Sequence, residues 1–211
     1  MPLLRALPSA LFEGLVALAS PPRCAACETR VSLQVIFCPP CALSVERAPI
    51  GVSDAQAIHL YGGAIAKAIT RFKYENQPHL ARPLAELLRK AKLPPKRPTM
   101  IVPVPLHRRR LADRGFNQAA LLAAPLARDW QLPLDVNALE RIRDTGRQAE
   151  LERIARLENM DAAFRATRTL SGHHVLLVDD VCTTGATLRA CAAELEVAGA
   201  TVCSLVLAIA V

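Results

Sequence analysis

The chain has 211 residues, of which 52% are apolar and 21% are charged, and its formal net charge is +7. This composition excludes a disordered polyelectrolyte, and nine glycines without a period exclude a collagen-like fibre. The length predicts one domain with an appendage. No apolar run approaches the roughly 18 residues of a membrane-spanning helix, so we expect the chain not to span a membrane.

The first twenty residues are apolar and superficially resemble a secretory signal. Glu13 interrupts the apolar segment, where a charge is costly, and only Arg5 supplies a positive charge before it. Leucines instead recur every three or four residues, as on one face of a helix: Leu4, Leu7, Leu11, Leu15 and Leu18. We expect an amphipathic docking helix over residues 1–20 and a cytoplasmic protein.

Four of the seven cysteines form two Cys-x2-Cys pairs separated by ten residues: Cys24, Cys27, Cys38 and Cys41. Each pair can hold a metal ion from a tight turn, and two pairs complete a tetrahedral thiolate shell. Two disulfides or four free thiols are the alternatives, but without a secretory signal disulfides are rare. We therefore predict a zinc ribbon over residues 21–50, with a structural zinc ion because no coordination position remains for water.

The middle of the chain is strongly basic. Residues 61–170 carry 21 basic and 11 acidic side chains, whereas residues 171–211 carry one and four. Such a segment is either a solvated arginine-rich surface or a surface that binds phosphates. Within it we predict a first parallel strand over residues 100–104, a basic loop over 106–110, a chain break at 113–115 and a helix over 118–129.

The last part of the chain predicts a strand–loop–helix–strand unit. An apolar run over residues 173–181 ends in Asp179 and Asp180, and such a run is typical of a strand buried on both faces of a parallel sheet. A helix over 188–197 and a strand over 201–208 follow. The fold class is therefore α/β, with a loop at the carboxyl end of a buried strand.

That loop has the chemistry of a phosphate site. Amides at the start of a helix attract anions, a glycine permits close approach, and hydroxyls add donors. These residues are Thr183, Thr184, Gly185, Ala186 and Thr187. Asp179 and Asp180 can accept hydrogen bonds from vicinal sugar hydroxyls and help to hold Mg²⁺ through water. A polar loop that merely closes a strand is the weaker alternative.

The stretch over residues 175–187, Val-Leu-Leu-Val-Asp-Asp-Val-Cys-Thr-Thr-Gly-Ala-Thr, resembles the phosphoribosyl pyrophosphate (PRPP) motif of type I phosphoribosyltransferases. Further segments and the cysteine pairs resemble the ComF family, the competence protein F group: residues 61–62, 71–74, 102–106, 114–118 and 143–148. The resemblance implies a parallel-sheet phosphoribosyltransferase-like core with hood elements over residues 51–211. It also implies that Asp179 and Asp180 act as the catalytic pair that orients the ribose.

The resemblance gives the basic middle a role as well. The loop after the first strand faces pyrophosphate in such enzymes, and the planar guanidinium groups of Arg108 and Arg109 suit that task. A solvent-facing basic turn is the equal alternative. Residues 141–148 would lie where related enzymes keep a closing loop, but Gly146, Arg147 and Glu150 depart from the family's pattern and put tight closure in doubt.

Two functions follow from these residues and the resemblance. The first is a ComF-like protein that binds PRPP or a related phosphoribosyl ligand, with an implied role in DNA uptake during natural transformation, single-stranded DNA and a helicase-like protein being its partners. The second is a Mg²⁺-dependent phosphoribosyltransferase acting on a nucleobase or amine without a DNA role. The acceptor is not identified by any residue of the chain.

Overall fold

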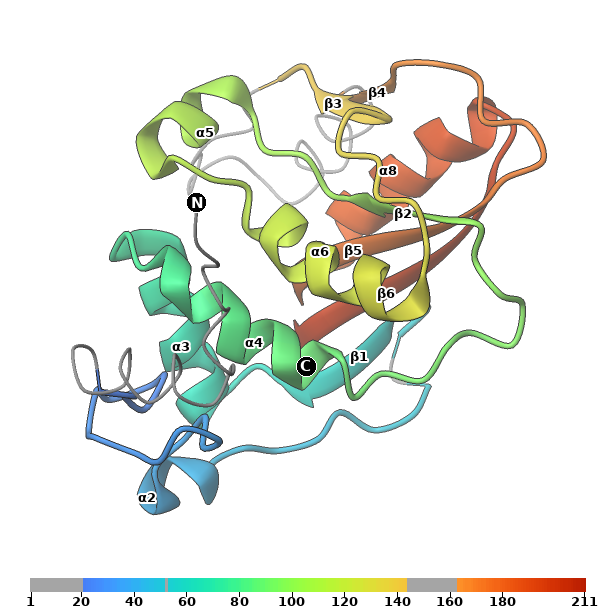
Figure 1. Ribbon diagram of the computed structural model, residues 1–211. Coiled ribbons are helices and arrows are strands. Elements are labelled where there is room, and N and C mark those ends of the chain that lie inside the picture. Colours follow the sequence, from blue (N-terminus) through green and yellow to red (C-terminus); the bar gives the residue numbers. More distant parts are fainter. Residues whose placement is uncertain (1–20, 52, 144–162) are drawn as a thin grey trace, which may run out of the picture.

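The computed structural model describes residues 21–51, 53–143 and 163–211, and its centre is a four-stranded sheet (Figure 1). The strands are β1 (Gln56–Leu60), β2 (Met100–Pro103), β5 (His174–Cys182) and β6 (Thr201–Ile209). They lie in the order β1-β6-β5-β2, and every pair is parallel. The predicted α/β class and parallel sheet are confirmed.

The first strand is a correction to the sequence prediction. Residues 100–104 were expected to open the sheet, but β1 precedes them and pairs with β6. Its sequence, Gln-Ala-Ile-His-Leu, is short and mixes apolar with polar residues, so no apolar run marks it. The other strands lie within one residue of their predicted bounds, and Pro103 stands at the end of an edge strand, where the missing amide costs no ladder bond.

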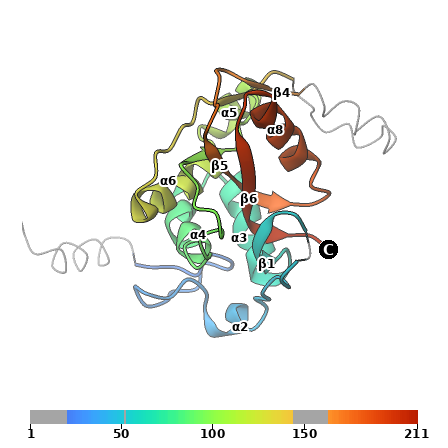
Figure 2. The same ribbon diagram turned by 90° about the vertical axis from the view of Figure 1, so that its right-hand side faces the viewer.

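Helices cover both faces of the sheet (Figure 2). Helices α4 (Ala81–Leu88) and α6 (Gln118–Trp130) pack on one face, and α8 (Ala186–Val197) packs against β5 and β6 on the other. Strand β5 therefore has buried side chains on both faces, and this is why its sequence is an uninterrupted apolar run. Leu176 and Val178 join the cluster on the α4 and α6 side, whereas Val175 and Leu177 join the α8 side.

The remaining elements lie around this core. Helix α3 (Gly63–Tyr74) follows β1 and contributes to the cluster that contains α4 and α6. A 3-10 turn, η1 (Pro78–Leu80), joins it to α4. Two short strands, β3 (Leu139–Arg141) and β4 (Phe164–Ala166), form a separate antiparallel pair, and β4 packs on α8.

The basic segment after β2 is a second correction. It was predicted as a loop, but it forms helix α5 (Arg108–Arg114). Arginine, leucine and alanine favour helix, His107 accepts the amide hydrogen of Arg109 through its side chain, and Gly115 ends the helix at φ +78°. Asp113 therefore lies inside a helix, and Gly115 alone makes the predicted break.

Two further predictions concern the chain ends and membranes. The amphipathic helix predicted for residues 1–20 lies outside the described residues. Among the residues that the structure describes, no helix is long and apolar enough to cross a membrane.

Candidate functional site

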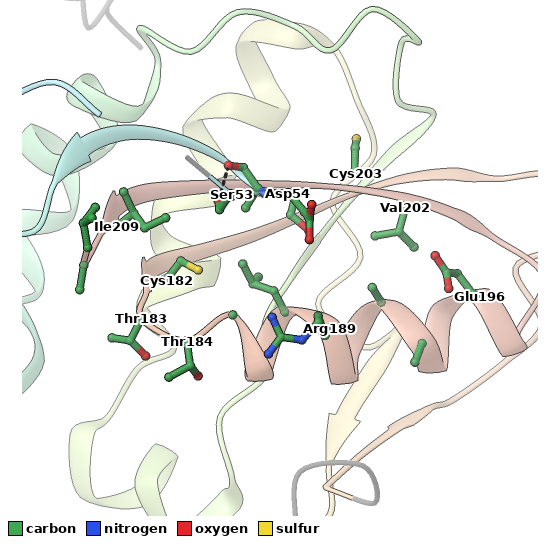
Figure 3. Close-up of a pocket in the computed structure, with 18 residues that line it drawn as sticks. Ser53, Asp54, Cys182, Thr183, Thr184, Arg189, Glu196, Val202, Cys203 and Ile209 are labelled. Atoms are coloured by element: carbon green, nitrogen blue, oxygen red, sulfur yellow. Dashed lines mark hydrogen bonds between the residues drawn. The ribbon is translucent and has the colours of Figure 1, made fainter. Parts of the chain in front are cut away.

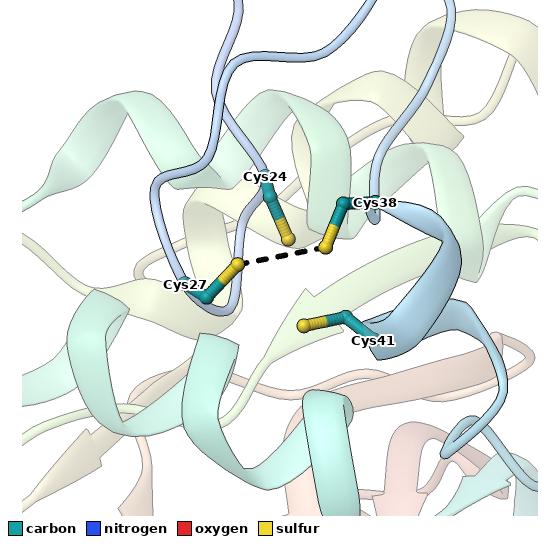
Figure 4. Close-up of side chains that lie close together, drawn as sticks. All are labelled: Cys24, Cys27, Cys38 and Cys41. Carbon is teal, nitrogen blue, oxygen red and sulfur yellow. Dashed lines mark hydrogen bonds between the residues drawn. The ribbon is translucent and has the colours of Figure 1, made fainter.

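The four cysteines of the predicted ribbon come together (Figure 4). Cys24 and Cys27 lie in a turn closed by the hydrogen bond from the Cys24 amide to the Thr29 carbonyl (2.8 Å), while Cys38 caps helix α2 (Pro39–Ala42) and Cys41 lies within it. The four sulfur atoms all lie within 4.8 Å of one another. A tetrahedral zinc ion with Zn–S bonds of about 2.3 Å separates its sulfurs by about 3.8 Å, so this donor set fits such an ion.

The electrostatics of the cluster favour a bound cation. Hydrogen bonds with the side chain and backbone of Thr29 lower the pKa of Cys27 to about 6. Burial and the neighbouring thiols raise the pKa of Cys41 to about 12. Four thiols this close cannot all ionise without a positive charge among them, and a divalent metal ion supplies that charge.

The threonine loop opens helix α8 and lines a cavity of about 510 Å³ (Figure 3). Gly185 adopts φ +74°, and Thr183 and Thr184 are exposed beside it. The Thr184 hydroxyl accepts a hydrogen bond from the Ala186 amide at 3.4 Å. The amides at the start of a twelve-residue helix, together with two accessible hydroxyls, make this loop able to bind a phosphate group.

The acidic pair lies just before this loop, with its two side chains on opposite faces of the sheet. Side chains alternate along a strand, so Asp179 lies on the α8 side and Asp180 on the side of α4 and α6. Both are buried, with 9% and 2% of their surface exposed. The Asp180 amide donates to Oδ1 of Asp179 at 2.8 Å.

A lysine from helix α3 neutralises one member of the pair. The Nζ atom of Lys73 lies 2.8 Å from Oδ2 of Asp180. Burial alone would lower the pKa of Lys73, but the charges of Asp180 and Asp179 outweigh it and raise that pKa. Burial, and next the charge of Asp180, raise the pKa of Asp179 to about 8. In the free protein the pair therefore holds one ion pair and one carboxyl that resists ionisation.

Sequence reasoning missed two cations of this region. Lys73 is separated from Asp180 by more than one hundred residues, and its only signal was its place in the segment over residues 71–74 that resembles ComF proteins. Arg189 lines the cavity beside the threonines, and a Cβ atom at Gly185 would lie 2.7 Å from its Nη1 atom. Its signal was weaker still, because it is simply the only basic residue after position 170.

The structure does not bring every predicted site residue together. Thr183, Thr184 and Gly185 line the cavity, but Ala186 and Thr187 do not, and neither does the acidic pair. Arg108 and Arg109 are exposed on α5, and among the described residues no hydrogen bond or ion pair joins them to the acidic pair or the threonine loop. The predicted departures at 146, 147 and 150 fall outside the described residues.

Comparison with known proteins agrees with this geometry. The phosphoribosyl transferase domain family model matches residues 74–211. DNA utilization protein YhgH of Salmonella typhi is 32% identical over 187 residues, which cover 78% of this chain and 80% of that protein. Competence protein F of Haemophilus influenzae is 39% identical over 130 residues, which cover 57% of each chain.

Two more distant likenesses complete the comparison. Competence protein ComFC of Bacillus subtilis is 29% identical over 137 residues, which cover 64% of this chain and 54% of that protein. A solved hypoxanthine phosphoribosyltransferase from Trypanosoma cruzi aligns with 67% of this chain and 64% of its own chain, at 17% identity and a TM-score of 0.31.

Proposed function

Because the chain belongs to the phosphoribosyl transferase domain family and is related to competence proteins, we propose that it binds PRPP or a related phosphoribosyl ligand together with Mg²⁺. One observation carries this proposal: a buried acidic pair and a threonine loop lie side by side at the carboxyl end of β5. In open α/β sheets, ligands bind in the crevice at that edge.

Each half of the site has a chemical task. The amides at the start of α8 and the hydroxyls of Thr183 and Thr184 donate to the 5-phosphate, and the Arg189 guanidinium lies beside them as a counter-charge. Asp179 and Asp180 accept hydrogen bonds from the vicinal ribose hydroxyls. Magnesium, when bound with the ligand, neutralises its pyrophosphate charge.

The ribbon has a structural task in this proposal. Four thiolates within 4.8 Å of one another form a closed shell for zinc, and such a shell stabilises a segment too small to fold alone. Its neighbours reinforce this role, because Cys24 and Cys38 belong to the same buried cluster as helices α3, α4 and α6.

The test of the ligand site is calorimetric titration with Mg²⁺–PRPP. The double variant Asp179→Asn, Asp180→Asn should lose binding by about 2 kcal/mol or more, since hydrogen bonds to charged groups contribute about 1.5 to 3 kcal/mol each. Asp129→Asn is the matched control, because Asp129 pairs with Arg89 on the α4–α6 contact and not with the site. Unchanged binding in the double variant would exclude the proposed use of the pair.

The DNA role rests on the names of the relatives and on the basic middle of the chain. We infer that single-stranded DNA contacts exposed arginines of α5, with a helicase-like protein as partner. Binding through phosphates weakens linearly with salt on a log–log plot. Replacing Arg108 and Arg109 by Gln should therefore lower both the affinity and the salt slope in fluorescence anisotropy, and a salt-independent affinity would exclude this arrangement.

Measuring the release of pyrophosphate from PRPP distinguishes the transferase alternative from the binding role. If the protein releases pyrophosphate from PRPP with a nucleobase or an amine and does not bind DNA at low salt, it is an active phosphoribosyltransferase. Binding of PRPP without pyrophosphate release supports the binding role.

A further inference from the structure

Three consecutive residues at the end of helix α3 contact three different parts of the molecule. The side chain of Arg71 reaches the cysteine ribbon, Phe72 stacks on Phe116 at a centroid separation of 5.2 Å, and Lys73 pairs with Asp180. Residues two apart on a helix point in nearly opposite directions. The last turn of α3 therefore lies between the ribbon on one side and the acidic pair on the other.

The ribbon side of this junction is built from backbone as well as side-chain contacts. Arg71 is 7% exposed, and its Nη1 atom donates to the carbonyl of Ala25 at 2.9 Å and of Cys24 at 3.5 Å. Its Nη2 atom pairs with Glu28, and its Nε atom lies 3.2 Å from Glu75. Both carbonyls belong to the turn that holds the first two metal-ligating cysteines, so the clamp depends on the shape of that turn.

The site side of the junction is equally short. Asp180 is 2% exposed, and Lys73 neutralises its carboxylate. Lys73 lies in the same helical turn as Arg71, on the opposite side of the helix. A ligand that hydrogen-bonds to Asp180 must therefore adjust the carboxylate that Lys73 holds. Arg71 and Lys73, two residues apart on α3, therefore connect the ribbon carbonyls to Asp180.

We propose that the last turn of α3 couples metal binding in the ribbon to ligand binding at the acidic pair, with Arg71 as the ribbon-side anchor and Lys73 as a positioning residue for Asp180. This inference rests on the proposed phosphoribosyl function. A ribbon without metal no longer fixes the carbonyls of Cys24 and Ala25, and Arg71 then loses its ribbon partners and keeps only Glu75 and Gln77. Ordering one end lowers the entropic cost of ordering the other, and such coupling is reciprocal.

The test follows zinc transfer from the whole protein to a zinc-selective chromogenic chelator, with and without saturating Mg²⁺–PRPP. Ligand should slow zinc release by at least about fivefold, the lower end of ordinary coupling. Arg71→Met should bring the ratio of the release rates without and with ligand close to one. Glu28→Gln, which changes the exposed ribbon partner of Arg71, should do the same. Arg71→Lys should restore part of the slowing, and Arg89→Met, which removes an ion-paired arginine directly after α4, should leave it unchanged.

The outcomes separate this inference from the proposed function. The coupling is wrong, and the ligand site stands, if calorimetry shows ligand binding but zinc release is not slowed. The same holds if the ligand still slows zinc release in both Arg71→Met and Glu28→Gln. If no ligand binds, the proposed function fails, and the junction is tested alone. Lys73→Met should then change the zinc-release rate in the natural background and not beside Arg71→Met; equal effects in both backgrounds would overturn the coupling.

Discussion

The cysteine ribbon and the acidic pair are two sites built by opposite means. The ribbon brings its four sulfurs together with two local turns, and all four ligands lie within eighteen residues. Both residues of the acidic pair lie in one strand, β5. Their charge state, however, depends on Lys73, which comes from a helix much earlier in the chain. Spacing therefore reveals the first site almost completely, whereas it reveals only the position of the second.

The two sites also differ in what stabilises them. The sulfurs of the ribbon repel one another as thiolates unless a metal ion joins them. In the acidic pair, the Asp180 carboxylate is neutralised by a lysine that the protein itself supplies. Removing a metal-ligating cysteine from the ribbon should therefore destabilise the protein through loss of the metal ion. Removing Lys73 from the acidic pair should destabilise it by leaving a buried charge uncompensated.

The largest expected effect is on the ribbon. Cys41→Ser should abolish stoichiometric zinc binding, because a three-thiolate site loses much of a binding free energy of about 10 to 16 kcal/mol. Metal analysis and thermal unfolding measure the loss. Cys203→Ser is the control, since Cys203 lies on β6 away from the cluster. A metal-free variant with the natural melting temperature would contradict the structural role of zinc.

The next effect is on the acidic pair. Lys73→Met should lower the free energy of unfolding by about 3 kcal/mol or more, since it leaves the buried Asp180 carboxylate without its partner. Adding Asp180→Asn to the same chain should recover most of that loss, because the unpaired charge is then gone. Urea unfolding of the single and double variants measures both. A single variant as stable as the natural protein would show that Lys73 is not needed as a counter-ion.

The pH dependence of ligand binding sharpens the contrast further. Asp179 has a folded pKa of about 8, above the ordinary value of 3.8, so it is protonated in the free protein below about pH 8. Its contribution to stability is present below pH 3.8 and is lost as pH rises toward 8. An ionised carboxylate accepts hydrogen bonds from ribose hydroxyls more strongly than a protonated one, so ligand affinity should rise by up to about tenfold per pH unit until about pH 8.

This rise is measured by calorimetry between pH 6 and pH 9. Asp179→Asn should flatten the profile, because no proton then has to leave on binding. A natural protein with equal affinity at pH 6 and pH 8 would show that Asp179 is already ionised or does not touch the ligand.

Sequence alone predicts three of the four strands of the sheet and the position of the acidic pair and threonine loop at the end of one of them, and it fails where long-range contacts decide. The apolar run of β5 and the glycine at 185 are local signals with one physical meaning each. Strand β1 carries no such run, since pairing with β6 and not its own pattern makes it a strand. Lys73 reads as one more basic residue until the fold buries it beside Asp180.

The smallest expected effect compares two glycines with the same backbone conformation. Gly185 and Gly115 have φ of +74° and +78°, so alanine at either position should cost about 1 kcal/mol of stability. A Cβ atom at 185 would lie 2.7 Å from Nη1 of Arg189, whereas at 115 it would meet open space. Gly185→Ala should therefore displace the guanidinium from the phosphate loop, and Gly115→Ala should not.

Urea unfolding and calorimetry with Mg²⁺–PRPP separate the two contributions. Both variants should lose similar stability, but only Gly185→Ala should weaken ligand binding, by about tenfold or more, because a charge-assisted bond to phosphate contributes about 1.5 kcal/mol or more. Equal affinity in the two variants would mean that the loop binds phosphate without Arg189, through the amides at the start of α8 alone. Weakened binding in Gly115→Ala would instead place the ligand against the end of α5, beside the arginines that the sequence assigned to pyrophosphate.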